Sequence, residues 1–233
     1  MYVWHILSRV DTFKYLGILL HTKLSWSPHI EAVCSKARKV LGLLYRRFYA
    51  DCDSTTILQL YTVLVRPHME YACPVWAPYT AKDIGALESV QKFACRMATH
   101  NWTSDYQELL SLTNLPTLER RRTELQLSHL FKIVHNLCFF PEALVTIWEC
   151  SHYNIRTTHS LALHQPFAHT NNYLNSFLPH SVSIWNRLAD EIVHSTSLRS
   201  FKSQLRLYEQ LWPSHFCIII VCFIVLAVTN LFV

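Results

Sequence analysis

The feature that most constrains the fold is the spacing of apolar residues over residues 27–48, which recur at intervals of three and four. Because an α-helix makes one turn in 3.6 residues, this spacing puts them on one face of a long helix. Ser27 is the predicted N-cap, Pro28 suits the first helical position, and Glu31 suits the positive end of the helix dipole. We therefore predict a helix from Ser27 to about Arg47 with one buried stripe. The stripe consists of Ile30, Val33, Ala37, Leu41, Leu44 and Phe48.

The composition limits the class of fold that contains this helix. Of the 233 residues, 51% are hydrophobic and only 16% are charged, so the chain can bury a core and is not disordered over most of its length. The presence of only three glycines argues against a loop-rich β-sandwich, and no Gly-rich phosphate-binding motif occurs. The composition therefore predicts a mainly α-helical protein.

Short β and turn signals flank the long helix. Residues 13–20 are rich in aromatic and aliphatic side chains and predict a strand. Asp53 and Ser54 are typical of a helix start, and the helix that follows should end before Pro67, because proline disfavours a helical residue ahead of it. Residues 73–79 contain two prolines and predict a loop.

Capping residues and apolar periodicity predict further helices. Thr80 and Asp83 resemble a capping box for a third helix, and Ser104 with Gln107 marks a short fourth helix. Residues 139–179 lose the helical period, which predicts a long connection between two helical lobes. Longer helices are predicted at residues 118–137, 181–193 and 197–212.

A series of short motifs runs through most of the chain. The motifs lie at residues 13–20, 24–30, 66–76, 87–92, 115–122, 156–159, 175–179, 184–188 and 197–202. Their order and spacing resemble the region that follows the palm in reverse transcriptases of non-LTR (LINE-type, jockey-like) retrotransposons. One departure is Ala189, where the family usually has a proline.

The resemblance implies a mainly α architecture with a helical thumb-like bundle. Residues 1–26 would form the short N-terminal β element that ends the palm, residues 27–138 the thumb-like region, and residues 139–212 a connector and second helical lobe. In this family the metal-binding carboxylates, with an adjacent Asp-Asp pair, lie upstream of the segment that matches residues 13–20. The resemblance therefore implies a truncated relic of an RNA-directed DNA polymerase that lacks the catalytic palm. Such a chain has no catalytic residue or cofactor and is not an enzyme as it stands.

The strongest candidate for binding is a row of cations on the first long helix. At about 100° per residue, four cations fall within about a third of the circumference, beside the apolar stripe. Such a row can follow the phosphates of an RNA or DNA duplex without reading bases. The alternative is a solvated face whose last cations complement the helix dipole. The four residues are Lys36, Lys39, Arg46 and Arg47.

Other polar clusters favour structural roles. Asp51 and Asp53 are a close pair of carboxylates, but their position before a helix start favours capping over magnesium binding. The three arginines at residues 120–122 spread around the helix axis, so one is expected to pair with Glu119 or Glu124. Another is open to contact with phosphate or with an intramolecular partner. The sequence predicts no small-molecule ligand.

The eight cysteines and fourteen histidines predict neither a disulfide framework nor a metal site. Residues 1–10 do not have the pattern of a signal peptide, so we expect reduced structural thiols. The best ligand set, Cys138, Cys150 and His152, matches no zinc finger or knuckle. The tryptophans of the motifs are interpreted as packing anchors rather than stacking platforms for bases. They are Trp26, Trp76 and Trp185.

The last segment, residues 213–233, is predicted to be a C-terminal hydrophobic helix. Residues 216–233 carry no charge, and a helix of this length spans about 27 Å, at the lower end of what a bilayer core needs. This favours an alternative function, a tail-anchored membrane protein whose helical body is a cytosolic interaction domain. If the hydrophobicity of the tail is accidental, the expected location is cytoplasmic or nuclear.

Overall fold

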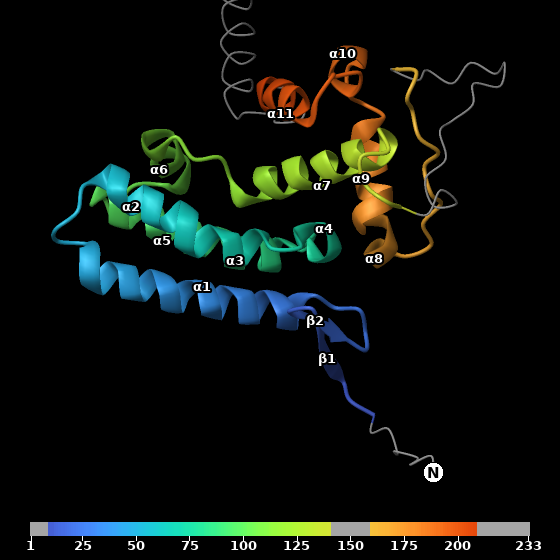
Figure 1. The fold of residues 1–233 in the computed structure, drawn as a ribbon. Coiled ribbons are helices and arrows are strands. Elements are labelled where there is room, and N and C mark those ends of the chain that lie inside the picture. The colour runs from blue at the N-terminus through green and yellow to red at the C-terminus, as the bar shows by residue number, and fades with distance from the viewer. Residues whose placement is uncertain (1–8, 141–158, 209–233) are drawn as a thin grey trace, which may run out of the picture. The chain divides into compact units, whose positions relative to one another are not determined.

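The computed structural model describes residues 9–140 and 159–208, which are mainly helical with a short two-stranded sheet near the N-terminus (Figure 1). This confirms the predicted fold class. The predicted hydrophobic helix at residues 213–233 lies outside the described residues. The chain divides into two compact units: residues 1–122 with 169–177, and residues 123–168 with 178–233. The domain limits drawn from the sequence stay a prediction.

The N-terminal β element is a hairpin rather than the single strand predicted at residues 13–20. Strand β1 (Thr12–Tyr15) pairs antiparallel with β2 (Ile18–His21), and Tyr15 lies opposite Ile18. The two turn residues both have positive φ, 45° at Leu16 and 88° at Gly17. This is the backbone of a type I′ turn, whose twist matches that of the strands, and Gly17 supplies one of its left-handed positions without strain.

Helix α1 (Ser27–Phe48) confirms the long helix, but Ser27 is not its N-cap. Trp26 occupies the cap position without a side-chain cap, and Ser27 Oγ instead donates a hydrogen bond to Asp83 Oδ2 at 2.9 Å. Phe48 is 37% exposed, so the buried stripe ends before it. The buried residues of α1 are His29, Ile30, Cys34, Ala37, Leu41 and Leu44.

The second helical stretch continues through Pro67, so the predicted end before this proline was wrong. Helix α2 (Ser54–Leu60) passes into a π-helical turn, η1 (Tyr61–Val65), and then into α3 (Arg66–Glu70). The N–H of Arg66 bonds to the carbonyl of Tyr61, five residues back. The wider turn accommodates a proline that donates no hydrogen bond of its own. The predicted loop at residues 73–79 also contains a short helix, α4 (Cys73–Trp76).

Helix α5 (Ala81–Thr99) is the central helix of the first unit, and α1, α2 and α6 (Tyr106–Thr113) all pack against it. Its predicted capping residue is confirmed, because the Thr80 side chain accepts from the N–H of Asp83. The cap of α6 is Asp105 rather than Ser104. The short helix α8 (Asn171–Leu174) also belongs to this unit.

The second unit contains residues 123–134 of α7 (Leu118–Val134), most of α9 (Phe177–Trp185), α10 (Asp190–Val193) and α11 (Leu198–Leu207). The single helix predicted at residues 181–193 is therefore two helices. Three buried aromatic rings form its core: Phe131 stacks on Phe201 with ring centroids 4.5 Å apart, and Trp185 packs against Phe201 at 5.9 Å.

No helix within residues 9–140 and 159–208 is long and apolar enough to cross a membrane. The predicted membrane segment at residues 216–233 lies outside these ranges. Cys34, Cys73 and Cys95 are free thiols buried in the first unit, where they pack as small apolar side chains.

Candidate nucleic-acid interface

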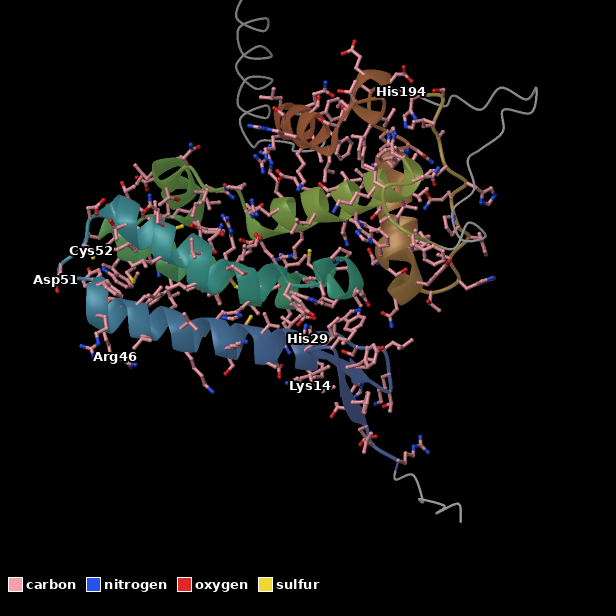
Figure 2. All side chains as sticks on the ribbon, in the orientation of Figure 1. Lys14, His29, Arg46, Asp51, Cys52 and His194 are labelled. Atoms are coloured by element: carbon pink, nitrogen blue, oxygen red, sulfur yellow. The ribbon has the colours of Figure 1, made fainter. Side chains whose placement is uncertain are left out.

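The outward face of α1 carries the four cations that the sequence singled out, and all four are exposed. The buried stripe of the helix lies on the other side, where α1 packs against α5. Figure 2 shows Arg46 near the C-terminal end of α1, with His29 and Lys14 at its opposite end. The structure therefore brings Lys36, Lys39, Arg46 and Arg47 together on one accessible face.

The row is uniformly positive. No acidic residue occurs in α1 between Lys36 and Arg47, a distance of about 16 Å along the helix axis. In the described parts of the chain, none of the four cations forms an ion pair. A fifth cation of the helix, Arg38, is held on another face, where its Nη2 donates to Ser89 Oγ at 3.0 Å. The charges of the row are thus available to an outside anion.

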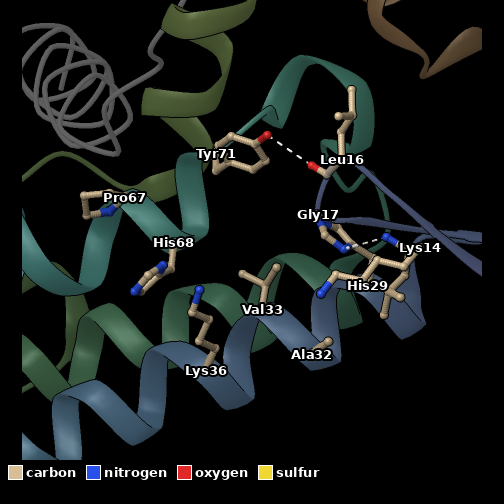
Figure 3. A pocket seen from close by; sticks show the side chains of 11 residues that line it. Lys14, Leu16, Gly17, His29, Ala32, Val33, Lys36, Pro67, His68 and Tyr71 are labelled. Atoms are coloured by element: carbon tan, nitrogen blue, oxygen red, sulfur yellow. Dashed lines mark hydrogen bonds between the residues drawn. The ribbon is translucent and has the colours of Figure 1, made fainter.

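A pocket of about 570 Å³ lies at the N-terminal end of this row (Figure 3). It is formed by the β1–β2 hairpin, α1 and α3, and Lys36 belongs both to the pocket and to the row. Sequence analysis missed it, because its walls come from three segments that no single periodicity connects. The lining residues are Lys14, Leu16, Gly17, Leu19, His29, Ala32, Val33, Lys36, Pro67, His68 and Tyr71.

Two hydrogen bonds fix the hairpin that forms one wall of the pocket. The N–H of Leu19 donates to His29 Nδ1 at 3.2 Å, and the Tyr71 hydroxyl donates to the carbonyl of Leu16 at 3.1 Å. The His29 ring also packs against the buried Trp76, with centroids 5.0 Å apart. Burial lowers the pKa of His29, which favours the neutral ring whose Nδ1 accepts this bond.

The bond from Leu19 fixes the tautomer of His29. Because Nδ1 accepts, the proton of the neutral ring lies on Nε2, which is buried and has no partner among the described residues. A buried donor without an acceptor costs roughly 1–3 kcal/mol. His29 thus holds the hairpin against α1 at some cost to stability.

An aromatic cluster lies at the other end of the row, and no pattern in the sequence predicted it. Tyr45 and Tyr49 of α1 pack with Phe93 of α5 and with Trp102, which follows α5 in the chain. Trp102 Nε1 donates to the Tyr49 hydroxyl at 3.2 Å. Trp102 is 39% exposed and Phe93 37%, so their rings offer apolar surface to a partner. Arg46 belongs to the same helical turn as the two tyrosines.

The remaining candidates have structural roles. The Asp53 side chain accepts from the N–H groups of Thr55 and Thr56 and caps α2, as predicted. Arg121 forms an ion pair with Glu70. Arg122 is 3% exposed and lies 3.9 Å from Glu88, and burial lowers the pKa of its guanidinium. These two arginines thus bind intramolecular carboxylates, as a structural role requires.

The tryptophan and metal predictions are tested only where the structure describes the chain. Trp76 and Trp185 are fully buried, which confirms them as packing anchors, and Trp26 is half-buried. Within residues 9–140 and 159–208, no group of three potential ligands is placed to hold a metal ion. Two members of the weak zinc set, Cys150 and His152, lie outside these residues.

Comparison with known proteins adds one weak similarity. No protein-family model and no solved structure matches the chain. A relative in Caenorhabditis elegans, the uncharacterized protein B0403.1, is 26% identical over 125 residues. The match covers 52% of this chain and 61% of the relative, so the chain spans less than two thirds of that protein. This similarity indicates neither a family nor an activity.

Proposed function

We propose that the first unit is a nucleic-acid-binding module that holds the sugar-phosphate backbone of a duplex along α1. The observation that carries the proposal is the row Lys36, Lys39, Arg46 and Arg47, which is exposed and contains no intervening acid. We further propose that the chain derives from the thumb and post-thumb region of a non-LTR reverse transcriptase, on the strength of its motif series, and that it does not polymerise by itself.

Counterion release predicts how the affinity for nucleic acid should depend on salt concentration. Each phosphate that a cation neutralises releases condensed counterions, so the affinity for B-form DNA falls with salt at a log–log slope of about −0.9 per contact. Four contacts predict a slope of about −3.6, or a loss of roughly 100-fold between 50 and 200 mM salt. Since the proposed contacts are to phosphates, which are the same at every base pair, binding should not depend on sequence. The exposed rings beside Arg46 can additionally stack on unpaired bases.

The test is a salt titration with two charge-matched variants. One variant changes Lys36, Lys39, Arg46 and Arg47 to Ala. The control variant removes the same amount of charge at residues that do not belong to α1. It changes Lys82, Lys92, Arg199 and Lys202 to Ala.

Affinity for a fluorescent 20-base-pair DNA duplex is measured by anisotropy at several salt concentrations, with an unrelated duplex sequence in parallel. The row variant should lose most of the salt dependence, and the control should keep it. If the affinities of the two variants depend equally on salt concentration, the cations of α1 form only a solvated face and the proposal is refuted.

A further inference from the structure

The pocket beside the hairpin is a concave site that differs from the row of cations along α1. Its volume of about 570 Å³ lies within the range of sites that enclose small molecules. Only Lys36 is shared with the row (Figure 3). The row extends along the exposed face of α1, whereas this site has the dimensions of a single small ligand.

Basic side chains reach the pocket from three different elements. Lys14 comes from β1, His29 and Lys36 from α1 and His68 from α3, and no acidic residue lines the pocket. Burial, and next the Lys36 ammonium, lower the pKa of His68. The site thus concentrates donors and positive charge without a lining carboxylate to balance them, and an anion would relieve this repulsion.

The rest of the pocket surface is largely apolar. Leu19 and Val33 contribute aliphatic side chains, Pro67 contributes its ring, and the Tyr71 side chain contributes an aromatic ring that is itself 58% exposed. A bare inorganic anion would leave these walls in contact with water. A ligand that uses the whole site therefore combines an anionic head with an apolar or aromatic body.

The site is held in shape before any ligand enters. His29 fixes the hairpin to α1 through the N–H of Leu19, and Tyr71 fixes it to the end of α3 through the carbonyl of Leu16. Because these bonds already order the walls, a ligand loses less free energy to the ordering of loops on binding.

We propose that this pocket binds a small phosphate monoester whose ester group is apolar or aromatic. A phosphate presents three acceptor oxygens, which suits donors that converge from β1, α1 and α3 better than the two oxygens of a carboxylate do. Lysines bind phosphate as point charges and need no fixed planar geometry. The ligand is a free small molecule, so the proposal holds or fails independently of duplex binding.

Calorimetric titration of the full chain with four simple probes tests the proposal. Phenyl phosphate should bind at least about five-fold more tightly than inorganic phosphate, because only the ester also covers the apolar wall. Benzoate should bind more weakly than phenyl phosphate, and phenol should not bind measurably. Equal affinity for phenyl phosphate and inorganic phosphate, or for phenyl phosphate and benzoate, would overturn the assignment.

Variants locate the binding in the pocket. Lys14→Ala and His68→Ala, which lie outside the row, should each weaken phenyl phosphate binding by about two- to five-fold, as expected for the loss of one solvent-accessible contact. The control Lys82→Ala removes a lysine of α5 that does not line the pocket and should leave the affinity unchanged. Circular dichroism verifies that each variant is folded. The His68 ring proton resonance of the unmodified chain gives a second readout, and a resonance that phenyl phosphate does not shift would also overturn the proposal.

Discussion

A buried hydrogen-bond network in the first unit allows a quantitative test of its packing. Gln91 of α5 is fully buried, and its Oε1 accepts from the Tyr61 hydroxyl at 2.8 Å. Its Nε2 donates to the carbonyl of Pro116 at 2.8 Å and to the Tyr106 hydroxyl at 3.1 Å. Replacement of Gln91 by Leu keeps most of the volume but removes all three bonds.

The main cost comes from the Tyr61 hydroxyl, which is left buried without an acceptor, at roughly 1–3 kcal/mol. The two lost bonds to Tyr106 and Pro116 are only partly buried and add about 1 kcal/mol together. Gln91→Leu should therefore lower the free energy of unfolding by about 2–4 kcal/mol. Urea titration of the full chain, followed by circular dichroism, measures this change. Hydrogen exchange of α5 peptides assigns it to the first unit.

The pair Gln91→Leu and Tyr61→Phe makes the test specific. In the double variant neither the hydroxyl nor the amide remains, so no orphaned group is left at this contact. The loss in free energy of unfolding of the double variant should be smaller than the sum of the losses of the two single variants by about 1–3 kcal/mol. Additivity within about 0.5 kcal/mol would refute the argument that orphaned polar groups dominate the cost.

Two further predictions concern titratable groups. Hydrogen bonds from the Thr56 side chain and backbone and from the Thr55 backbone lower the pKa of Asp53 below its ordinary value of 3.8. The ionised Asp53 therefore contributes stability above pH 3.8, and this contribution is lost as the pH falls through the lowered pKa. The variant Asp53→Asn keeps a capping oxygen but does not titrate, so its stability, measured by thermal unfolding, should decline less steeply below pH 4 than that of the unmodified chain. The same pH dependence in both proteins would contradict this. Burial raises the pKa of the Cys73 thiol to about 12, so a disulfide reagent at pH 8 should modify the half-exposed Cys52 in the native chain and Cys73 only after unfolding, as detected by mass spectrometry. Rapid native modification of Cys73 would contradict its burial.

Local signals predicted those parts of the fold that local interactions determine. The period of α1 and the caps Asp53 and Thr80 depend on residues within one or two turns of each other, and the structure confirms them. Ser27 follows the same local rule, but a partner far along the chain, Asp83, takes its hydroxyl. The hairpin was missed because Leu16 takes a left-handed conformation that its residue type disfavours.

The candidate site likewise has one part that a local pattern predicts and one part that depends on long-range packing. The exposed face of α1 follows from its period, so the sequence was enough to put the four cations on one face, while their role in binding stays a prediction. The pocket requires Lys14 from β1 and His68 from α3 to meet Lys36 of α1. That meeting depends on long-range packing, including the hydrogen bond from Leu19 to His29. No pattern within a single segment contains this information.

The π-helical turn η1 determines the direction in which the side chains of α3 point. In a regular α-helix, eight residues overshoot whole turns by about 80°, so Tyr61 and Met69 would face different directions. The wider turn reduces this overshoot, and Tyr61, Val65 and Met69 are all completely buried. Deletion of one residue from η1 would rotate α3, and with it Tyr71 and the wall of the pocket, away from α1. This stretch therefore tolerates changes in residue type far better than changes in the number of residues.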